Sequence, residues 1–269
     1  MVRQLVVRQH RDAAAGAAAV NATAPRTLPL ALALLAALAS PSVVAAASVD
    51  SASSALEYLW GRMRGPYTTE ERLAQYAKVV EGRLRKQFEE KKLPYPPPEL
   101  ALLAFKDTRV LEVYARAADG ETKWVFVKQY GVEGASGNSG PKLKEGDKQV
   151  PEGIYAVTAL NPNSRFHLSL RLDYPNAFDQ EMGKRDGRTR LGSDIMIHGE
   201  NSSVGCLAMG NDAAEDLFVL AALVGLEKVK VVISPTDFRK GGTAALAATP
   251  SWVHDLYWTL RLELTKYAR

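Results

Sequence analysis

The feature that most constrains the fold is a change in hydrophobic period near Ala101. From this point apolar side chains recur at every second position, as they do across residues 111–115. This alternation is the pattern of a β-strand that buries one face. The turn sequence Ala118-Asp119-Gly120 separates this stretch from residues 124–127 and predicts a hairpin.

Further strands are expected at residues 154–160, 168–172 and 228–234. Residues 131–146 are rich in glycine, serine and lysine and predict a loop. Short strands with hairpin signals favour a twisted antiparallel β-sheet over alternating βαβ units. We therefore expect a mainly β (α+β) domain over residues 99–236, with helices flanking it from both ends of the chain.

The N-terminal flanking helix is predicted by a capping box. In Thr68-Thr69-Glu70-Glu71 a hydroxyl is followed three residues later by a carboxylate. Apolar residues at helical spacing continue to Phe88, and the prolines of residues 94–98 end the helix. Residues 48–98 are thus interpreted as a helical preface with a proline-rich linker.

Two more helices are expected towards the C-terminus. Asn211 is a candidate N-cap for residues 212–224, with Gly225 as the stop. Residues 237–269 predict a loop and a last helix that opens at Pro250. The helical spacing of its apolar residues predicts burial of one face, formed by Val253, Leu256, Leu260 and Leu264.

Residues 1–47 have the composition of a signal peptide. Four arginines precede an apolar core at residues 28–38, and Ala45-Ala46-Ala47 offers small residues for cleavage. The core is shorter than the roughly 20 apolar residues that a stable membrane span needs. We expect export to the periplasm with a mature start near Ser48; the alternative is an uncleaved N-terminal anchor.

Charge and residue counts exclude several function classes. The formal net charge is +4, and no basic block is interleaved with aromatic residues, so nucleic acid is not an expected partner. A single cysteine excludes an intramolecular disulfide. Four scattered histidines lack the His-x-x-x-His spacing of a zinc site, so neither a metal nor another cofactor is expected.

The only cysteine, Cys206, follows His198 by eight positions. The apolar run Ile195-Met196-Ile197 delivers the histidine, and glycines and serines bring the chain back to the cysteine. A thiol becomes a nucleophile when an imidazole takes its proton, so we expect Cys206 to be partly thiolate beside His198. The alternative is that Cys206 is a small buried hydrophobe.

These residues carry a resemblance to a known family. His198-Gly199, followed by Ser203-Val204-Gly205-Cys206-Leu207-Ala208-Met209, resembles the signature of the L,D-transpeptidase catalytic domain (YkuD-type). The turn sequence of residues 146–155 resembles a second landmark of that family. The likeness covers about residues 101–235 and is greatest to murein L,D-transpeptidase-like proteins of Gram-negative bacteria. It implies a twisted antiparallel β-sandwich.

The resemblance also implies roles for individual residues. Cys206 would be the nucleophile and His198 the base, oriented by the backbone carbonyl of Gly199. The backbone N–H groups of Gly205 and Cys206 would hold the oxyanion, and Ser203 would order the loop or position the substrate. His167 and His254 are expected to be structural or on the surface.

Two departures from the family pattern concern substrate recognition. Val204 stands where most members have a second histidine, and Ala208 where most have an arginine. Residues 174–192 read as a polar loop that carries several cations. They are either an ordinary solvated loop or a cationic rim for substrate carboxylates, with Arg188 and Arg190 as candidate binding residues.

The resemblance implies acyl transfer on peptidoglycan stem peptides. Such a reaction would form cross-links or attach a protein to the wall, which makes a wall-anchored lipoprotein a second candidate partner. Contact with a membrane is expected only through the export signal. Two alternatives stay open, namely a thiol amidase or endopeptidase that cuts links to the stem peptide and a non-catalytic wall-binding module.

Overall fold

The computed structural model describes residues 65–118, 121–242, 244 and 249–268. The predicted signal peptide and the turn at residues 119–120 lie outside this part of the chain. The described residues belong to one compact unit, Gly65–Arg269. None of their helices is both long enough and apolar enough to cross a membrane.

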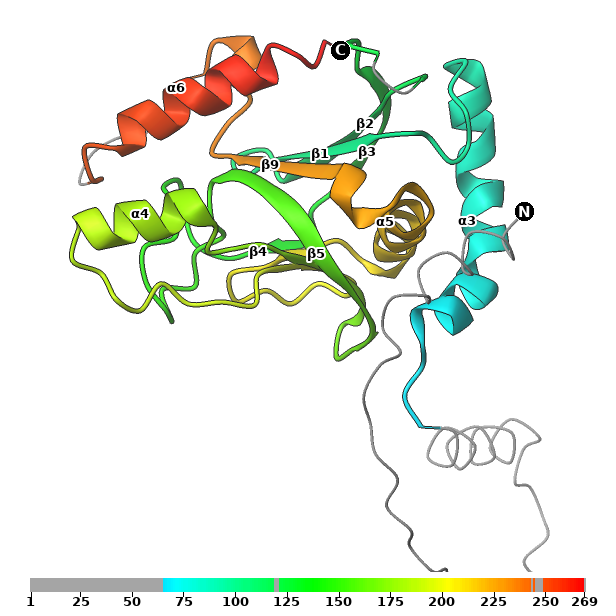
Figure 1. The fold of residues 1–269 in the computed structure, drawn as a ribbon, viewed down its shortest axis with the longest axis horizontal. Helices are drawn as coiled ribbons and strands as arrows, with labels where there is room; N and C mark the ends of the chain where they lie inside the picture. Colours follow the sequence, from blue (N-terminus) through cyan, green and yellow to red (C-terminus); the bar gives the residue numbers. More distant parts are fainter. Residues whose placement is uncertain (1–64, 119–120, 243, 245–248, 269) are drawn as a thin grey trace, which may run out of the picture. The chain divides into compact units, whose positions relative to one another are not determined.

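Nine strands form the described sheet in the order β3-β2-β1-β9-β5-β6-β7-β8-β4. Helices flank them, as the mainly β (α+β) prediction requires, so that prediction is confirmed (Figure 1). The strands are β1 (Leu100–Phe105), β2 (Val110–Ala115), β3 (Val125–Gly131), β4 (Gly134–Ala135), β5 (Gly153–Ser164), β6 (His167–Leu172), β7 (Met196–His198), β8 (Leu207–Ala208) and β9 (Val229–Ser234). The helices are α3 (Thr69–Glu90), α4 (Ala177–Arg185), α5 (Asn211–Val224) and α6 (Val253–Leu264), with short 3-10 turns at η1 (Leu226–Lys228) and η2 (Phe238–Lys240).

The long strand β5 joins the two halves of the sheet. Its first residues pair with β9, and the residues from Val157 onward pair with β6. Most pairings are antiparallel, as expected, but β1 with β9 and β7 with β8 are parallel. Hairpin signals report only on strands joined by a tight turn, so they could not predict the direction of strands joined by longer connections.

Strand β1 is the centre of the packing because both of its faces are buried. Leu100, Leu102 and Ala104 belong to the core that α3 and α5 cover, and the alternate residues belong to a second core under α6. A continuous apolar run is typical of a strand that is buried on both sides. Figure 1 shows α6 lying over β1 and β9, with α3 and α5 side by side on the right.

The predicted capping box of α3 is confirmed. Thr68 accepts a hydrogen bond from the backbone N–H of Glu71, and the Glu71 carboxylate accepts one from the N–H of Thr68. The inner face of the helix buries Val80, Leu84 and Phe88 in the main core. The preface helix therefore packs on the β-structure.

Strand β2 is buried on both faces, although its alternation predicted one polar face. Leu111 and Val113 lie in the main core, while Tyr114 lies in the second core and Glu112 is also buried. The Glu112 carboxylate forms an ion pair with Arg239 at 2.7 Å and accepts a hydrogen bond from the Tyr114 hydroxyl. Alternating apolar and polar residues do not reveal whether the polar face of a strand meets solvent or a second packed layer. Here that face is covered by a layer that contains the C-terminal segment.

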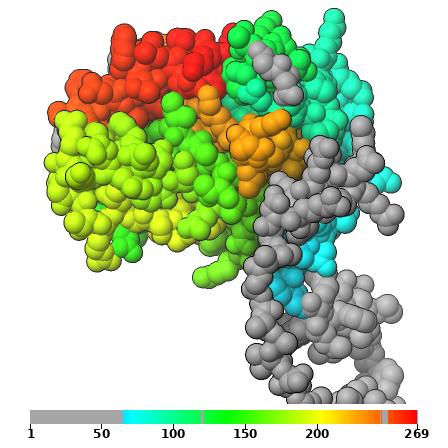
Figure 2. All heavy atoms as spheres, viewed as in Figure 1, coloured from blue at the N-terminus to red at the C-terminus, as the bar shows by residue number. Residues whose placement is uncertain are grey.

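The prediction of a polar loop over residues 174–192 was wrong where α4 forms. Asn176 and Asp179 make a capping box that starts this helix, and Phe178 packs edge-to-face on Trp252 with 5.8 Å between ring centroids. The segment reads as a loop because most of its residues are polar, and the Asn-x-x-Asp signal was missed. In Figure 2, α4 (yellow-green) lies directly beneath the C-terminal segment (red).

The predicted inner face of α6 is confirmed, since Val253, Leu256, Leu260 and Leu264 are all buried. We expect Leu260→Ala to lower the free energy of unfolding by about 2–5 kcal/mol, because it leaves a cavity in the second core. Leu262 on the same helix is 52% exposed, so Leu262→Ala should change that energy by no more than about 0.5 kcal/mol. Urea denaturation of the two variants measures both values, and equal losses would contradict the packing described.

Candidate active site

Strands β7 and β8 pair in parallel, with His198 as the last residue of β7 and Cys206 directly before β8. Ile197 pairs with Leu207, and His198 pairs with Ala208. Ile197 and Leu207 point into the main core. Because side chains alternate along a strand, His198 is directed to the opposite face, and Cys206 directly precedes the inward-facing Leu207. In this register His198 and Cys206 are offset by two residues, and the two strands lie about 4.8 Å apart.

Local contacts fix the ring of His198. Its Nδ1 lies 2.7 Å from the carbonyl oxygen of Gly199, and the ring stacks on Phe166 with 4.7 Å between centroids. A carbonyl oxygen only accepts hydrogen bonds, so Nδ1 carries the proton and Nε2 presents a lone pair. The structure thus brings Gly199 to the place that the resemblance implies.

Gly199 is required there by close packing. A Cβ at this position would lie 2.7 Å from Asn211 Oδ1 and 2.9 Å from both the Cβ of His167 and the carbonyl oxygen of Phe166. The chain after His198 is therefore held tightly against neighbouring loops, which also keeps the Gly199 carbonyl in place.

The thiol of Cys206 donates to the carbonyl oxygen of Asp194 at 3.7 Å rather than to His198. Burial raises the pKa of Cys206, and the Asp194 charge adds to this; a backbone hydrogen bond at Met196 and the Lys142 charge oppose it. Burial also lowers the pKa of His198, against the hydrogen bond to Gly199. Both directions favour a neutral thiol and a neutral imidazole in this geometry, in contrast to the partly ionised Cys206 expected from the sequence.

Two serines tie the Cys206 turn to the end of β4. The Ser203 hydroxyl donates to the Cys206 carbonyl at 2.7 Å and accepts from the backbone N–H of Ser136 at 3.3 Å. The backbone N–H of Gly205 donates to Ser136 Oγ at 2.6 Å. Gly205, which was expected to hold an oxyanion, therefore has its N–H occupied in this conformation. Its φ of +104° is one that other residues rarely adopt.

The two candidate substrate-binding arginines are held by the protein itself. Arg188 donates to the Leu143 carbonyl at 2.7 Å and pairs with Asp186 at 2.8 Å. Arg190 is exposed and pairs with Glu145 at 2.6 Å. Both cations brace the loop that follows residue 142, and among the described residues neither forms a hydrogen bond or an ion pair with Cys206.

Lys142, which was not singled out from the sequence, has a charge that lowers the pKa of the Cys206 thiol. Its amine is buried, pairs with Asp147 at 2.6 Å and donates to the Lys144 carbonyl at 2.9 Å. Its ion-pair partner Asp147 lies inside the landmark turn of residues 146–155, and this carboxylate was the one feature of the sequence that could have pointed to Lys142.

The remaining predicted residues have structural surroundings. His167 Nε2 lies 2.9 Å from Glu215 Oε1, and His254 is exposed on α6. Asn211 does not cap α5 as predicted, because the helix begins at Asn211 with Gly210 in the N-cap position. The Asn211 side chain instead accepts a hydrogen bond from the Glu200 backbone at 3.0 Å. Gly225 ends the helix as expected.

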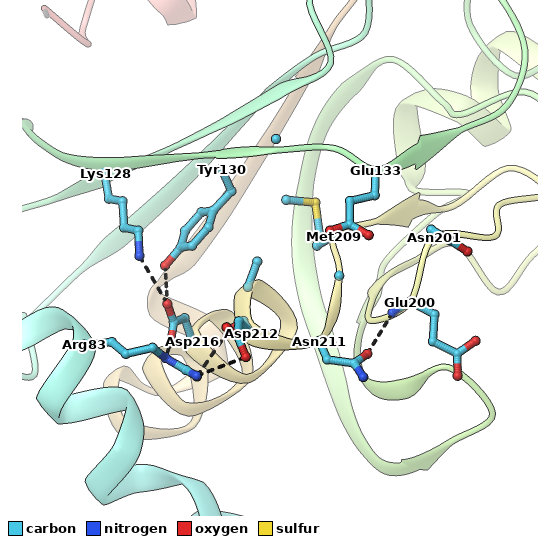
Figure 3. A pocket seen from close by; sticks show the side chains of 13 residues that line it. Arg83, Lys128, Tyr130, Glu133, Glu200, Asn201, Met209, Asn211, Asp212 and Asp216 are labelled. Atoms are coloured by element: carbon cyan, nitrogen blue, oxygen red, sulfur yellow. Dashed lines mark hydrogen bonds and ion pairs between the residues drawn. The ribbon is translucent and has the colours of Figure 1, made fainter.

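A cavity of about 810 Å³ opens where β7 and β8 end, and its lining contains neither His198 nor Cys206 (Figure 3). On one wall Arg83 and Tyr130 each bond to Asp216 at 2.8 Å, and Lys128 lies 3.5 Å from the same carboxylate. The opposite wall carries the acidic and amide side chains Glu133, Glu200 and Asn201. Among the described residues, no group of three His, Cys, Asp or Glu is placed to hold a metal ion.

The direction of the Cys206 pKa predicts slow alkylation near neutral pH. We expect the labelling midpoint with iodoacetamide to lie above about 8.5, the value of an ordinary thiol. Urea-unfolded protein should return to that value because the thiol is then solvated. Mass spectrometry across a pH series measures both, since the chain has one cysteine. A midpoint below 7.5 that rises in the His198→Ala variant would contradict this expectation and would support a thiolate at Cys206 paired with His198.

Comparison with known proteins finds a family match over most of the β-structure. The YkuD family model, described as the L,D-transpeptidase catalytic domain, matches residues 101–233. "Putative L,D-transpeptidase YafK" of Escherichia coli K12 is 35% identical over 136 residues, which are 49% of this chain and 52% of that protein; its counterpart in strain O157:H7 gives the same values. The chain thus spans about half the length of the curated relatives that it matches.

Among solved structures, the helical cell shape determining protein Pgp2 from Campylobacter jejuni is 26% identical. The match covers 55% of this chain and 50% of Pgp2, with a TM-score of 0.42. The family match includes strands β7 and β8, and with them His198 and Cys206. Residues 101–233 of this chain are therefore similar to the YkuD family of L,D-transpeptidase catalytic domains.

Proposed function

We propose that this domain catalyses cysteine-dependent acyl transfer on peptidoglycan stem peptides, with Cys206 as nucleophile and His198 as base. The observation that carries the proposal is the 2.7 Å contact between His198 Nδ1 and the Gly199 carbonyl. In a neutral imidazole this contact keeps the single N–H proton on Nδ1. The lone pair of Nε2 is then available to accept a proton. The parallel pairing of β7 and β8 supports the proposal, because it brings the end of β7, with His198, beside the chain that leaves Cys206.

Because both groups rest in the neutral form, the proton moves when the substrate is attacked. His198 Nε2 takes the thiol proton as Cys206 Sγ bonds to the peptide carbonyl carbon. The carbon–nitrogen bond then breaks, and the leaving amine takes the proton from His198. The thioester that remains passes its acyl group to an amine in transfer or to water in hydrolysis.

The oxyanion formed on attack needs hydrogen-bond donors near the thiol. The backbone N–H of Cys206 serves as one donor in this proposal. The Ser203 hydroxyl supports it by holding the Cys206 carbonyl at 2.7 Å, which fixes the orientation of the turn.

Hydrolysis by a thiol amidase is the second candidate, and one observation favours it. Val204, two residues before Cys206, is 70% exposed, so the edge of the Cys206 turn is open to water. A non-catalytic wall-binding module is disfavoured, because such a module has no need of an oriented base beside a cysteine.

The proposal also includes the cellular compartment in which the protein acts and the boundaries of its domains. The protein acts in the periplasm after loss of residues 1–47, and the catalytic domain spans residues 99–236. Residues 48–98 form the helical preface, and residues 237–269 form the C-terminal segment. A wall-anchored lipoprotein as acyl acceptor stays a prediction.

Purified sacculi test the proposal. Wild-type protein should form new cross-links in transfer or release peptide fragments in hydrolysis, and Cys206→Ala and His198→Ala should abolish either product. His254→Ala is the matched control and should retain wild-type turnover, since His254 is exposed on α6. Chromatography of digested sacculi with mass spectrometry measures the products. Binding to sacculi without any product, in wild type and variants alike, would support the binding module instead.

A further inference from the structure

Ser136 directly follows strand β4 and lies against the turn that carries the proposed nucleophile. Strand β4 pairs antiparallel with β8, so that Gly134 faces Ala208 and Ala135 faces Leu207. Hydrogen bonds with Ser203 and Gly205 hold Ser136 beside the residues that precede Cys206. A hydroxyl thus lies next to the Cys206 turn, on the side of β8 away from β7.

The hydrogen bonds around Ser136 show where its proton is. Its Oγ accepts the Gly205 N–H at 2.6 Å. Ser203 already uses its own proton on the Cys206 carbonyl. In the 3.4 Å contact between the two hydroxyl oxygens, Ser136 must therefore be the donor. This contact is long for O–H···O, and the Ser203 oxygen also accepts the Ser136 N–H. The Ser136 proton is weakly held and is free to turn to a better acceptor.

We propose that the Ser136 hydroxyl is the second oxyanion donor of this domain, in place of the Gly205 N–H. The inference rests on the proposed function of Cys206. When Sγ attacks and negative charge develops on the carbonyl oxygen, the hydroxyl turns from Ser203 to that oxygen. The Gly205 N–H stays on Ser136 Oγ and polarises the hydroxyl, since hydrogen bonds in a chain strengthen one another. The Cys206 N–H is the first donor.

The two possible donors give opposite results in Ser136→Ala. If the Gly205 N–H were the donor, removal of the hydroxyl would free it, and acylation of Cys206 would stay the same or become faster. If the hydroxyl is the donor, acylation should slow by at least about tenfold, since loss of one oxyanion donor costs about 10²–10³ in rate and the freed Gly205 N–H recovers part of this. Ser136→Thr keeps the hydroxyl and should stay within about threefold of wild type.

The experiment compares two reactions of the same thiol. Acylation by p-nitrophenyl acetate forms the Sγ–carbon bond through an oxyanion, and p-nitrophenolate leaves as its carbon–oxygen bond breaks. Alkylation by iodoacetamide displaces iodide and forms no oxyanion. Peptide mass spectrometry follows both products at Cys206 in the full-length protein. Ser136→Ala should slow acylation only, with alkylation within about twofold of wild type, and the exposed loop residue Ser202→Ala is the control that should change neither.

The outcomes separate this inference from the proposed function. No acylation of Cys206 in wild type, or acylation that does not need His198, would contradict the proposed function itself. Acylation of wild type together with unchanged or faster acylation of Ser136→Ala would overturn only the role of Ser136. A parallel loss of acylation and alkylation, or loss of acylation in Ser136→Thr as great as in Ser136→Ala, would show that Ser136 merely supports the turn and would also overturn it.

Discussion

The parallel pairing of β7 and β8 is the constraint on which the site depends. It buries Ile197 and Leu207 in the main core, and this burial sets the directions of the adjoining residues His198 and Cys206. A slip of one residue in either strand would exchange the faces and place a polar ring or a thiol in the core. The same apolar contacts that stabilise the sheet therefore set the orientation of the proposed catalytic pair.

Burial has an electrostatic consequence as well as a packing one. It raises the pKa of Cys206 and lowers that of His198, so a stable thiolate–imidazolium pair is disfavoured at rest. The protein instead fixes the direction of proton transfer through the Gly199 carbonyl. It orders the Cys206 turn with one hydrogen bond donated by Ser203 and one accepted by Ser136. The site is thus organised to stabilise the charges that develop on His198 and on the substrate oxygen during attack. Such an arrangement stabilises the transition state more than the ground state.

Much of this architecture is readable from local sequence, because local rules produce it. The capping box at Thr68, the buried face of α6 and the strand through Leu170 follow from spacing alone. Helix α4 was missed because its polar composition concealed the Asn176 cap, and Glu112 was misread because a second core covers β2. Strand β4 has two residues and no period of its own. It exists through pairing with β8, and so the contact between Ser136 and Gly205, 69 residues apart, has no signal in the sequence.

The tautomer of His198 is the most direct test of the account. Protein labelled with ¹⁵N-histidine, studied by long-range ¹H–¹⁵N correlation at pH 7.5, reports the protonation of each ring nitrogen. The His198 signals are identified by their loss in His198→Ala. The account predicts a neutral ring with the proton on Nδ1, held by Gly199, and a bare Nε2. A neutral ring protonated on Nε2, or a charged imidazolium, would contradict it, since neither could accept the Cys206 proton.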